Sequence, residues 1–225
     1  PSLAYAYQPS ALNILNNGHT VQVNYDPGST LQLENSAYDL VQFHFHAHSE
    51  HTSSGQAAPL ELHLVHRNAE GKLAVVGVWL EAGAENAAFS SVLNNLPATE
   101  SAVATIAGET VDAEALLPAE RAYYRYNGSL TTPPCTEGVK WVMLGESVEL
   151  APDQIAAFTN IFANDFRPAQ PLQSRTFLAA GETAPASGGL PSAGRSSADP
   201  AFLTVGISVV LLLSGLWLRR RLARS

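Results

Sequence analysis

The most regular pattern in the chain is an alternation of apolar and other positions within residues 41–67. Val41, Phe43 and Phe45 recur at every second position, the spacing of a strand with one buried face. After a polar break, a second alternating run covers residues 60–65. The sequence therefore predicts two neighbouring strands, each with a distinct second face.

Further strands are predicted before and after this pair. They cover residues 12–25 (with a turn at Asn16-Asn17-Gly18), 31–33, 39–48, 73–80, 123–130 and 139–144. The run 73–80 is apolar on both faces, which is typical of a central strand covered on two sides. Helical spacing is seen at residues 85–96 and 152–164. The predicted fold class is mainly β (α+β).

The C-terminal part of the chain follows another pattern. Residues 183–200 are rich in Ala, Ser, Gly and Pro without apolar periodicity, which predicts a flexible linker after a domain at 1–182. Residues 201–218 carry no charge and reach the lower end of the length that spans a ~30 Å hydrocarbon layer. The basic tail 219–225 follows. Because basic residues mark the cytoplasmic end of a membrane helix, the expected topology is single-pass, with the domain periplasmic or at the cell surface.

Composition and charge narrow the range of functions. The chain has 225 residues, of which 46% are hydrophobic, enough for one substantial core. All 20 acidic residues precede Phe202, with only 8 of the 12 basic ones, which leaves an excess of 12 negative charges. This charge argues against nucleic acid as a partner. The chain opens at Pro1 without a basic or apolar leader, so no signal peptide is predicted.

Six of the seven histidines lie within residues 41–67. His44 and His46 are two apart on a predicted strand, so they share one face about 6.6 Å apart along the backbone. His63 lies on the second run. If this run is a strand that neighbours the first, it supplies a third imidazole. Three neutral imidazoles with a fourth position left open are typical of catalytic zinc. The sequence therefore predicts a zinc site formed by these three residues.

Two polar side chains share the faces of the predicted ligands, Gln42 on the first strand and Glu61 on the second. Each is predicted to hydrogen-bond the outer ring nitrogen of a ligand and so to fix its tautomer. The other nearby histidines, His48, His51 and His66, are interpreted as solvated. The first of them lies where the strand enters a polar loop, and the last points away from the ligand face.

These motifs resemble those of the α-class carbonic anhydrases. QFHFH, SEHT and ELHLVH are followed by GSLTTPPC at residues 128–135 in the family's order, and the resemblance covers about residues 11–178. It implies a large, twisted, mostly antiparallel sheet with a few surface helices. It also implies zinc-dependent, reversible hydration of carbon dioxide to bicarbonate and a proton by a zinc-bound hydroxide. A family segment before Pro1 would be missing, and Cys135, the only cysteine, would find its partner there.

The resemblance also implies roles for single residues. Thr131 would accept a hydrogen bond from the zinc hydroxide and donate its own proton to Glu50. His19 would relay protons to bulk buffer, and the main-chain carbonyl of Asp165 would hold His46. The apolar wall for carbon dioxide and the threonine beside it match Val65, Val75, Leu130, Thr132, Val139 and Trp141.

Two other interpretations stay open at this point. In a cupin, the HxH pair and Glu50 would all bind the metal, but a cupin takes a further histidine from a distant strand and none follows His66. The second alternative is a catalytically silent carbonic-anhydrase-like surface binding module. Such relatives typically lose a zinc histidine, whereas all three are present in this chain.

Overall fold

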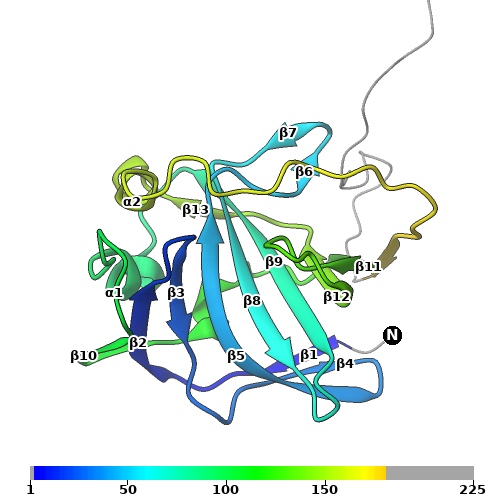
Figure 1. The fold of residues 1–225 in the computed structure, drawn as a ribbon, viewed down its shortest axis with the longest axis horizontal. Coiled ribbons are helices and arrows are strands. Elements are labelled where there is room, and N and C mark those ends of the chain that lie inside the picture. Colours follow the sequence, from blue (N-terminus) through cyan, green and yellow to red (C-terminus); the bar gives the residue numbers. More distant parts are fainter. Residues whose placement is uncertain (1–2, 181–225) are drawn as a thin grey trace, which may run out of the picture.

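The computed structural model describes residues 3–180, which fold around one large twisted sheet (Figure 1). The sheet has 12 strands, and its main path runs β10-β2-β3-β5-β8-β9-β12-β11-β14. The strands are β1 (Leu3–Ala6), β2 (Ser10–Asn16), β3 (Val21–Asn24), β4 (Thr30–Leu33), β5 (Ser36–His46), β8 (Leu60–Arg67), β9 (Leu73–Ala82), β10 (Ala104–Val111), β11 (Tyr123–Ser129), β12 (Glu137–Leu144), β13 (Val148–Leu150) and β14 (Leu178–Ala180). Within residues 3–180 only β12 and β13 pair with β9 in parallel. The prediction of a large, mostly antiparallel sheet is therefore confirmed.

The helical elements are short and lie outside the sheet. They are η1 (Ala87–Phe89), α1 (Ser90–Leu93), η2 (Ala113–Leu116) and α2 (Pro152–Thr159), and a separate hairpin joins β6 (Thr52–Ser53) to β7 (Gln56–Ala57). The predicted helix at 85–96 is wrong in length, because α1 ends at Leu93 with Asn94 as its C-cap. Pro97 follows shortly after, and its ring disfavours helical backbone ahead of it. The helix predicted at 152–164 likewise ends early, at Thr159, with Asn160 as its C-cap.

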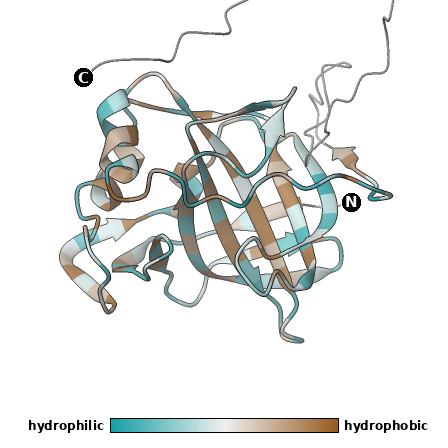
Figure 2. Cartoon of the chain, turned by 45° about the horizontal axis from the view of Figure 1, so that its top comes forward, coloured by the Kyte–Doolittle hydropathy of each residue, from teal (hydrophilic) through white to brown (hydrophobic). Residues whose placement is uncertain are grey.

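The central strands separate an apolar core from the opposite face of the sheet. Phe43 and Phe45 of β5 are fully buried in the main core, because side chains alternate along a strand. Phe89 and Phe158 from the helices pack against Phe45, with ring centroids 6.4 and 5.6 Å away. Figure 2 shows that hydrophobic residues line the central strands. The histidines of β5 therefore face away from this core.

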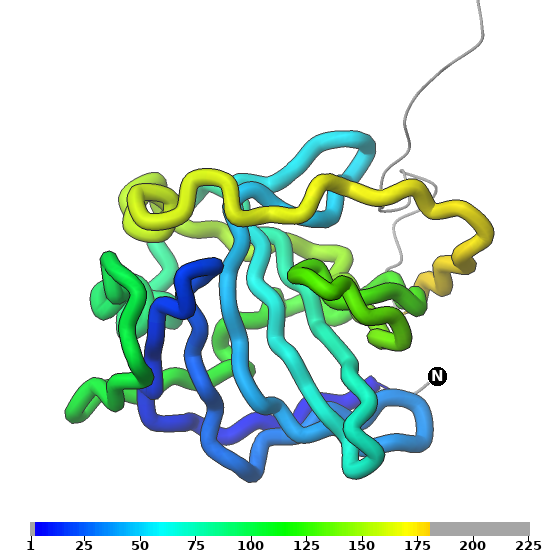
Figure 3. The backbone as a smooth tube through the Cα atoms, in the orientation of Figure 1, coloured from blue at the N-terminus to red at the C-terminus, as the bar shows by residue number. Residues whose placement is uncertain are grey.

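The chain after α2 crosses the end of β5 (Figure 3). The main-chain N–H of Asp165 donates to the carbonyl of Ala47 over 3.0 Å, and Oδ1 of Asp165 accepts from the N–H of Ala47 over 2.7 Å. These paired bonds fix the segment directly beyond the last residue of β5. Residues distant in sequence thereby reach the histidines.

No helix between residues 3 and 180 has the length and apolarity needed to cross a bilayer. The predicted linker, membrane helix and basic tail, at 183–225, lie outside the described residues.

His66 is buried in the structure, so its interpretation as a solvated residue is wrong. Its side chain points to the core side of β8, where Nε2 accepts a 2.7 Å hydrogen bond from the hydroxyl of Tyr7 and Nδ1 lies 3.3 Å from the carbonyl of Ala74. The Tyr7 ring stacks against the imidazole. Burial lowers the pKa of His66 to about 4, because a charged ring would lose its hydration.

This lowered pKa predicts a specific loss of stability in acid. Below the unfolded pKa of about 6.5 the unfolded chain binds a proton at His66 that the folded chain refuses until about pH 4. The contribution of His66 to the free energy of unfolding is therefore fully present above pH 6.5 and is lost as the pH drops from 6.5 to 4. Between pH 7 and pH 5 the loss should be about 2 kcal/mol. Urea unfolding of zinc-free protein should show a smaller pH dependence in His66→Gln than in the wild type. The exposed His48→Gln variant should keep the wild-type pH dependence, and equal curves for all three proteins would contradict the prediction.

Candidate metal centre

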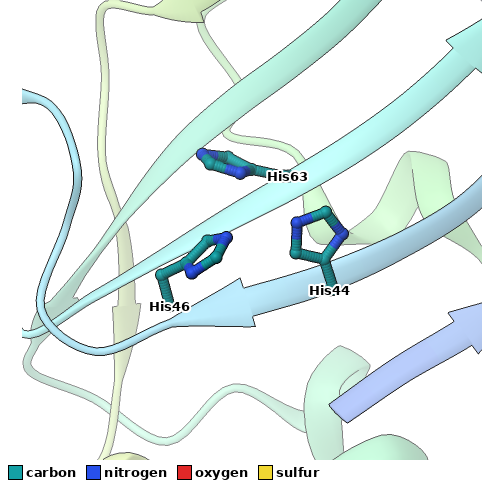
Figure 4. Close-up of side chains that lie close together, drawn as sticks. All are labelled: His44, His46 and His63. Atoms are coloured by element: carbon teal, nitrogen blue, oxygen red, sulfur yellow. The ribbon is translucent and has the colours of Figure 1, made fainter. Parts of the chain in front are cut away.

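The register of β5 against β8 brings three histidines together. His44 is paired directly with His63, and His46 lies two residues further along the same face of β5. The ring centroids are 5.0 Å (His44–His46), 5.3 Å (His44–His63) and 4.8 Å (His46–His63) apart. Figure 4 shows the three rings turned toward a common point. One nitrogen from each ring lies within 4.8 Å of the other two, so the group can hold a metal ion.

The outer nitrogen of each ring has its own acceptor. Nδ1 of His44 donates to Gln42 over 2.8 Å, and Nε2 of His63 donates to Glu61 over 2.5 Å. The opposite nitrogens, Nε2 of His44 and Nδ1 of His63, are thereby left unprotonated toward the common point. Both acceptors lie on the same strand as the ring they hold, which is why strand parity could predict them.

Asp165 holds the remaining ring. Its main-chain carbonyl accepts a 2.9 Å hydrogen bond from Nδ1 of His46, as the family resemblance implied. Nε2 of His46 is buried and has no hydrogen-bond partner among the described residues. A buried nitrogen without a hydrogen-bond partner is costly, and a metal ion at this point would satisfy it. Burial also raises the pKa of the Asp165 carboxyl to about 6.

Burial keeps the rings in the form that binds metal. It lowers the pKa of His44 well below its ordinary value, and the neighbouring His46 and His63 lower it further. The pKa of His63 is also lowered by burial, although the Glu61 carboxylate opposes this effect. A neutral imidazole keeps a free lone pair, so the site needs little proton release to accept a cation.

His51 is buried too, and its interpretation as a solvated residue is wrong. Its Nδ1 donates to Oε1 of Glu61 over 2.6 Å, and its Nε2 lies 2.7 Å from the hydroxyl of Tyr126. Although burial alone would lower the pKa of His51, the Glu61 carboxylate raises it above its ordinary value. Glu61 thus joins His51 to His63, and these three form a second histidine–carboxylate group whose atoms already bond one another. His48, in contrast, is exposed as expected.

Glu50 lies behind the histidines and is buried. Its Oε1 accepts a 2.7 Å hydrogen bond from the main-chain N–H of Arg167, and its Oε2 lies 4.0 Å from Nδ1 of His63. That second oxygen has no hydrogen-bond partner within residues 3–180. Thr131 lines the same small pocket as Glu50. Their predicted hydrogen bond stays a prediction, with an acceptor atom available for it.

Glu50 is not part of either group of side chains that could hold a metal ion in the described part of the chain. A cupin site requires this carboxylate among the ligands, and it also requires a histidine that this chain lacks. The geometry therefore argues against the cupin alternative.

Two of the three histidines, His44 and His46, line a cavity of about 310 Å³. Its lining residues are Asn17, His19, Thr20, Gln22, Gln42, His44, His46, Thr132 and Pro133. His19 is exposed at the rim on the turn between β2 and β3, where its main-chain N–H donates to Oδ1 of Asn17 over 2.9 Å. The Thr20 hydroxyl fixes the turn to the carbonyl of Phe45 over 2.6 Å. The shuttle candidate thus shares one cavity with two of the candidate ligands.

An apolar cluster lies beside this cavity. It contains all five predicted wall residues, which are Val65, Val75, Leu130, Val139 and Trp141. It also contains four side chains that sequence reasoning missed, which are Val41, Leu73, Tyr126 and Phe177. The Trp141 ring lies 4.8 Å from the His63 ring, centroid to centroid. Parity places Val41 on the face of Phe43, and only the register shift between Leu40 and Gln42 brings it into this cluster. Tyr126 and Phe177 come from β11 and the segment before β14.

The fold and the site together define a mainly β protein with a group of three histidines that can hold a metal ion, two of which line a cavity. Residues 2–180 match the family of eukaryotic-type carbonic anhydrases, and the chain belongs to this family.

Named relatives agree with this assignment. A carbonic anhydrase of Nostoc sp. is 45% identical over 174 residues, which are 77% of this chain and 66% of that protein. A carbonic anhydrase of Pectobacterium carotovorum is 42% identical over 178 residues, 78% of this chain and 72% of that protein. Among solved structures, the α-carbonic anhydrase of Thermovibrio ammonificans with the inhibitor sulfanilamide has a TM-score of 0.76 at 38% identity, covering 79% of this chain and 78% of that one.

Proposed function

We propose that this chain is a zinc enzyme that reversibly hydrates carbon dioxide to bicarbonate and a proton, with the metal held by His44, His46 and His63. The observation that carries the proposal is the convergence of three ring nitrogens, one of them buried without a partner among residues 3–180, beside a cavity that His44 and His46 line. Zinc accepts three imidazoles with one position left for water. Membership of the carbonic anhydrase family supplies the reaction.

The bound zinc would lower the pKa of a coordinated water to about 7, a value known for carbonic anhydrases, and so supply a nucleophile at neutral pH. The protein's contribution is to hold its ligands in one tautomer. Gln42, Glu61 and the carbonyl of Asp165 each accept the outer N–H of one ring, so each inner lone pair is aimed at the metal position.

Thr131 is proposed to orient the nucleophile. An ionised Glu50 can accept hydrogen bonds but cannot donate them, so a threonine hydroxyl beside it must donate its proton to the carboxylate. The Thr131 oxygen is then left as an acceptor, which turns the nucleophile's own proton away from the substrate. Oε2 of Glu50, unpartnered in the described part of the chain, supports this arrangement.

The apolar cluster is proposed to receive carbon dioxide. The substrate is small and nonpolar, and it gains little from a polar pocket but loses water favourably against Val65, Val139 and Trp141. Thr132, which lines the cavity, adds a polar group there for bicarbonate. Val75 and Leu130 complete the same wall.

A stopped-flow assay of carbon dioxide hydration tests the proposal. Zinc-loaded protein should accelerate hydration, a chelator should abolish the acceleration, and added zinc should restore it. Zinc-loaded protein without activity would overturn the proposal and favour the alternative of a silent surface binding module.

His19 is proposed to relay protons from the metal site to buffer, because it lies at the rim of the cavity that the ligands line. His19→Ala should lower turnover at least about tenfold in weak buffer. High imidazole should restore turnover, since an external base replaces the missing one, while the hydration step itself changes little. Matched assays at low and high imidazole, with exposed His48→Ala as control, check this. A loss that high imidazole does not repair would remove His19 from the relay.

We also propose that residues 201–218 anchor the protein in a membrane, with 183–200 as linker, 219–225 in the cytoplasm and the catalytic domain outside. The support is the uncharged run followed by four arginines, after a domain rich in acidic residues. Protease added to intact cells is expected to release an active domain that no longer sediments with membranes. Full protection of the domain would reverse the topology, and release without protease would contradict the anchor.

A further inference from the structure

Arg167 is the residue on which two parts of the candidate catalytic apparatus meet. It belongs to the segment after α2 that crosses the sheet, far in sequence from β5 and β11 (Figure 1). It was not among the residues that the sequence indicated. Together with Glu50, Ser129 and Thr131 it lines a small pocket of about 50 Å³ behind the histidines.

The main chain and the side chain of Arg167 bind different partners. Its N–H donates to Oε1 of Glu50 over 2.7 Å. Its guanidinium Nη1 donates to the hydroxyl of Ser129 over 3.1 Å and lies 3.5 Å from the carbonyl of Leu130. One residue thus reaches both the carboxylate and the two residues that immediately precede Thr131.

The turn that carries Thr131 has few other supports. Leu130 donates its N–H to the carbonyl of Thr136 over 2.9 Å, and Cys135 donates its N–H to the carbonyl of Thr132 over 2.9 Å. Both bonds lie within the loop and do not connect it to Glu50. Ser129 is the last residue of β11, and its carbonyl accepts from the indole N–H of Trp141 over 3.0 Å. Arg167 thus connects the two sides: its main chain binds Glu50, and its guanidinium binds Ser129 at the start of the turn.

We propose that Arg167 is a positioning residue that sets the separation of Thr131 from the Glu50 carboxylate. The planar guanidinium is rigid and always charged, so it holds neutral acceptors at a fixed distance better than a flexible ammonium. The inference rests on the proposed function, because it assigns Arg167 to the hydroxyl that orients the nucleophile. A displacement of about 1 Å at such a group can cost 10²-fold in rate.

The adjacent Arg175 provides a matched control. It lines the same pocket and lies over the Tyr126 ring, with its guanidinium carbon 5.7 Å from the ring centroid. Its hydrogen bonds go to the carbonyls of Leu172 and Pro171 within its own segment. Arg175→Gln removes the same charge from the same pocket without touching the link to Ser129.

The test is a double-mutant cycle with Thr131→Ala. Arg167→Gln should lower kcat/KM for carbon dioxide about tenfold when Thr131 is present and less than about twofold when it is absent, because the two residues act as one unit. Arg167→Lys should restore part of the loss, Ser129→Ala should reproduce part of it, and Arg175→Gln should cause little. Zinc content and thermal midpoints are measured for every variant, so that misfolding is recognised.

A second readout does not depend on turnover. A deprotonated sulfonamide keeps one N–H, which it can donate to the Thr131 hydroxyl only if that hydroxyl is held as a donor to Glu50. The dissociation constant of sulfanilamide from zinc-loaded protein should therefore rise with Arg167→Gln in the presence of Thr131 only. Equal losses in both backgrounds, or no loss in either measurement, would overturn the role of Arg167. An inactive wild-type protein would instead overturn the proposed function, and sulfanilamide binding would still decide the role of Arg167.

Discussion

His46→Ala is expected to remove zinc from the protein and, with it, measurable hydration of carbon dioxide. His46 supplies the inner nitrogen that is buried without a partner in the described structure, and its other nitrogen is already bound to the carbonyl of Asp165. Outer partners of zinc ligands alone are worth about 10- to 100-fold in metal affinity. Loss of a ligand itself should lower the metal affinity by more than that. After dialysis against a mild chelator, the zinc content of the variant should therefore fall to trace levels.

The measurement is zinc content per chain, followed by the stopped-flow assay on the same samples. His48→Ala is the matched control, because this side chain follows the same strand but is exposed and packs against the ring of Phe166. Gln42→Ala should fall between the two, since it removes only the acceptor that orients His44. A His46→Ala protein with one zinc per chain and full activity would rule out the proposed centre.

Metal loading should also raise thermal stability, because the ion binds the folded site and not the unfolded chain. The increase should be present in the wild type and lost in His46→Ala. This comparison separates a missing ligand from a general loss of folding.

The second large effect is expected for Thr131→Ala, which should lower kcat/KM about 10²-fold while zinc content stays unchanged. The hydroxyl is proposed to orient the nucleophile and not to bind the metal, so orientation and affinity should separate. Glu50→Gln should act in the same direction, because an amide can donate to the hydroxyl and so reverse the hydrogen bond.

Thr131→Ser keeps the hydroxyl and should restore most of the activity. Thr136→Ala is the matched control, since this exposed residue of the same loop contributes its main-chain carbonyl to Leu130. Unchanged kcat/KM in Thr131→Ala would remove the residue from the mechanism. A proportional fall of zinc and activity would assign it to metal binding instead.

The elements that could be predicted were the strands whose residue types alternate or form a continuous apolar run. Alternation located β5 and β8 and placed His44 and His63 on comparable faces, because a strand repeats every two residues. The edge strand β10 was not predicted, since most of its side chains are exposed and its pattern carries no apolar alternation. Helix lengths were overestimated for a related reason, because periodicity does not reveal where Asn94 and Asn160 end a helix.

The buried histidines show the limit of reading polarity from sequence. His51 and His66 were expected to be solvated, yet both are buried. Each is compensated by a partner distant in sequence, Tyr126 in one case and Tyr7 in the other. A polar side chain can be buried once such a bond exists, and no local pattern announces it.

The sequence by itself determined which chemistry is available. Three imidazoles at strand spacing, and acceptors at the same parity, follow from local backbone geometry and hold in any sheet that pairs these two strands. The tertiary structure alone decided how the site is completed. Asp165 and Arg167 reach His46 and Glu50 from more than a hundred residues away, because the chain after α2 is laid across the end of β5. The family resemblance implied the first of these contacts, but no pattern in the sequence did. Such contacts depend on the three-dimensional path of the chain, which alternation along a single strand does not encode.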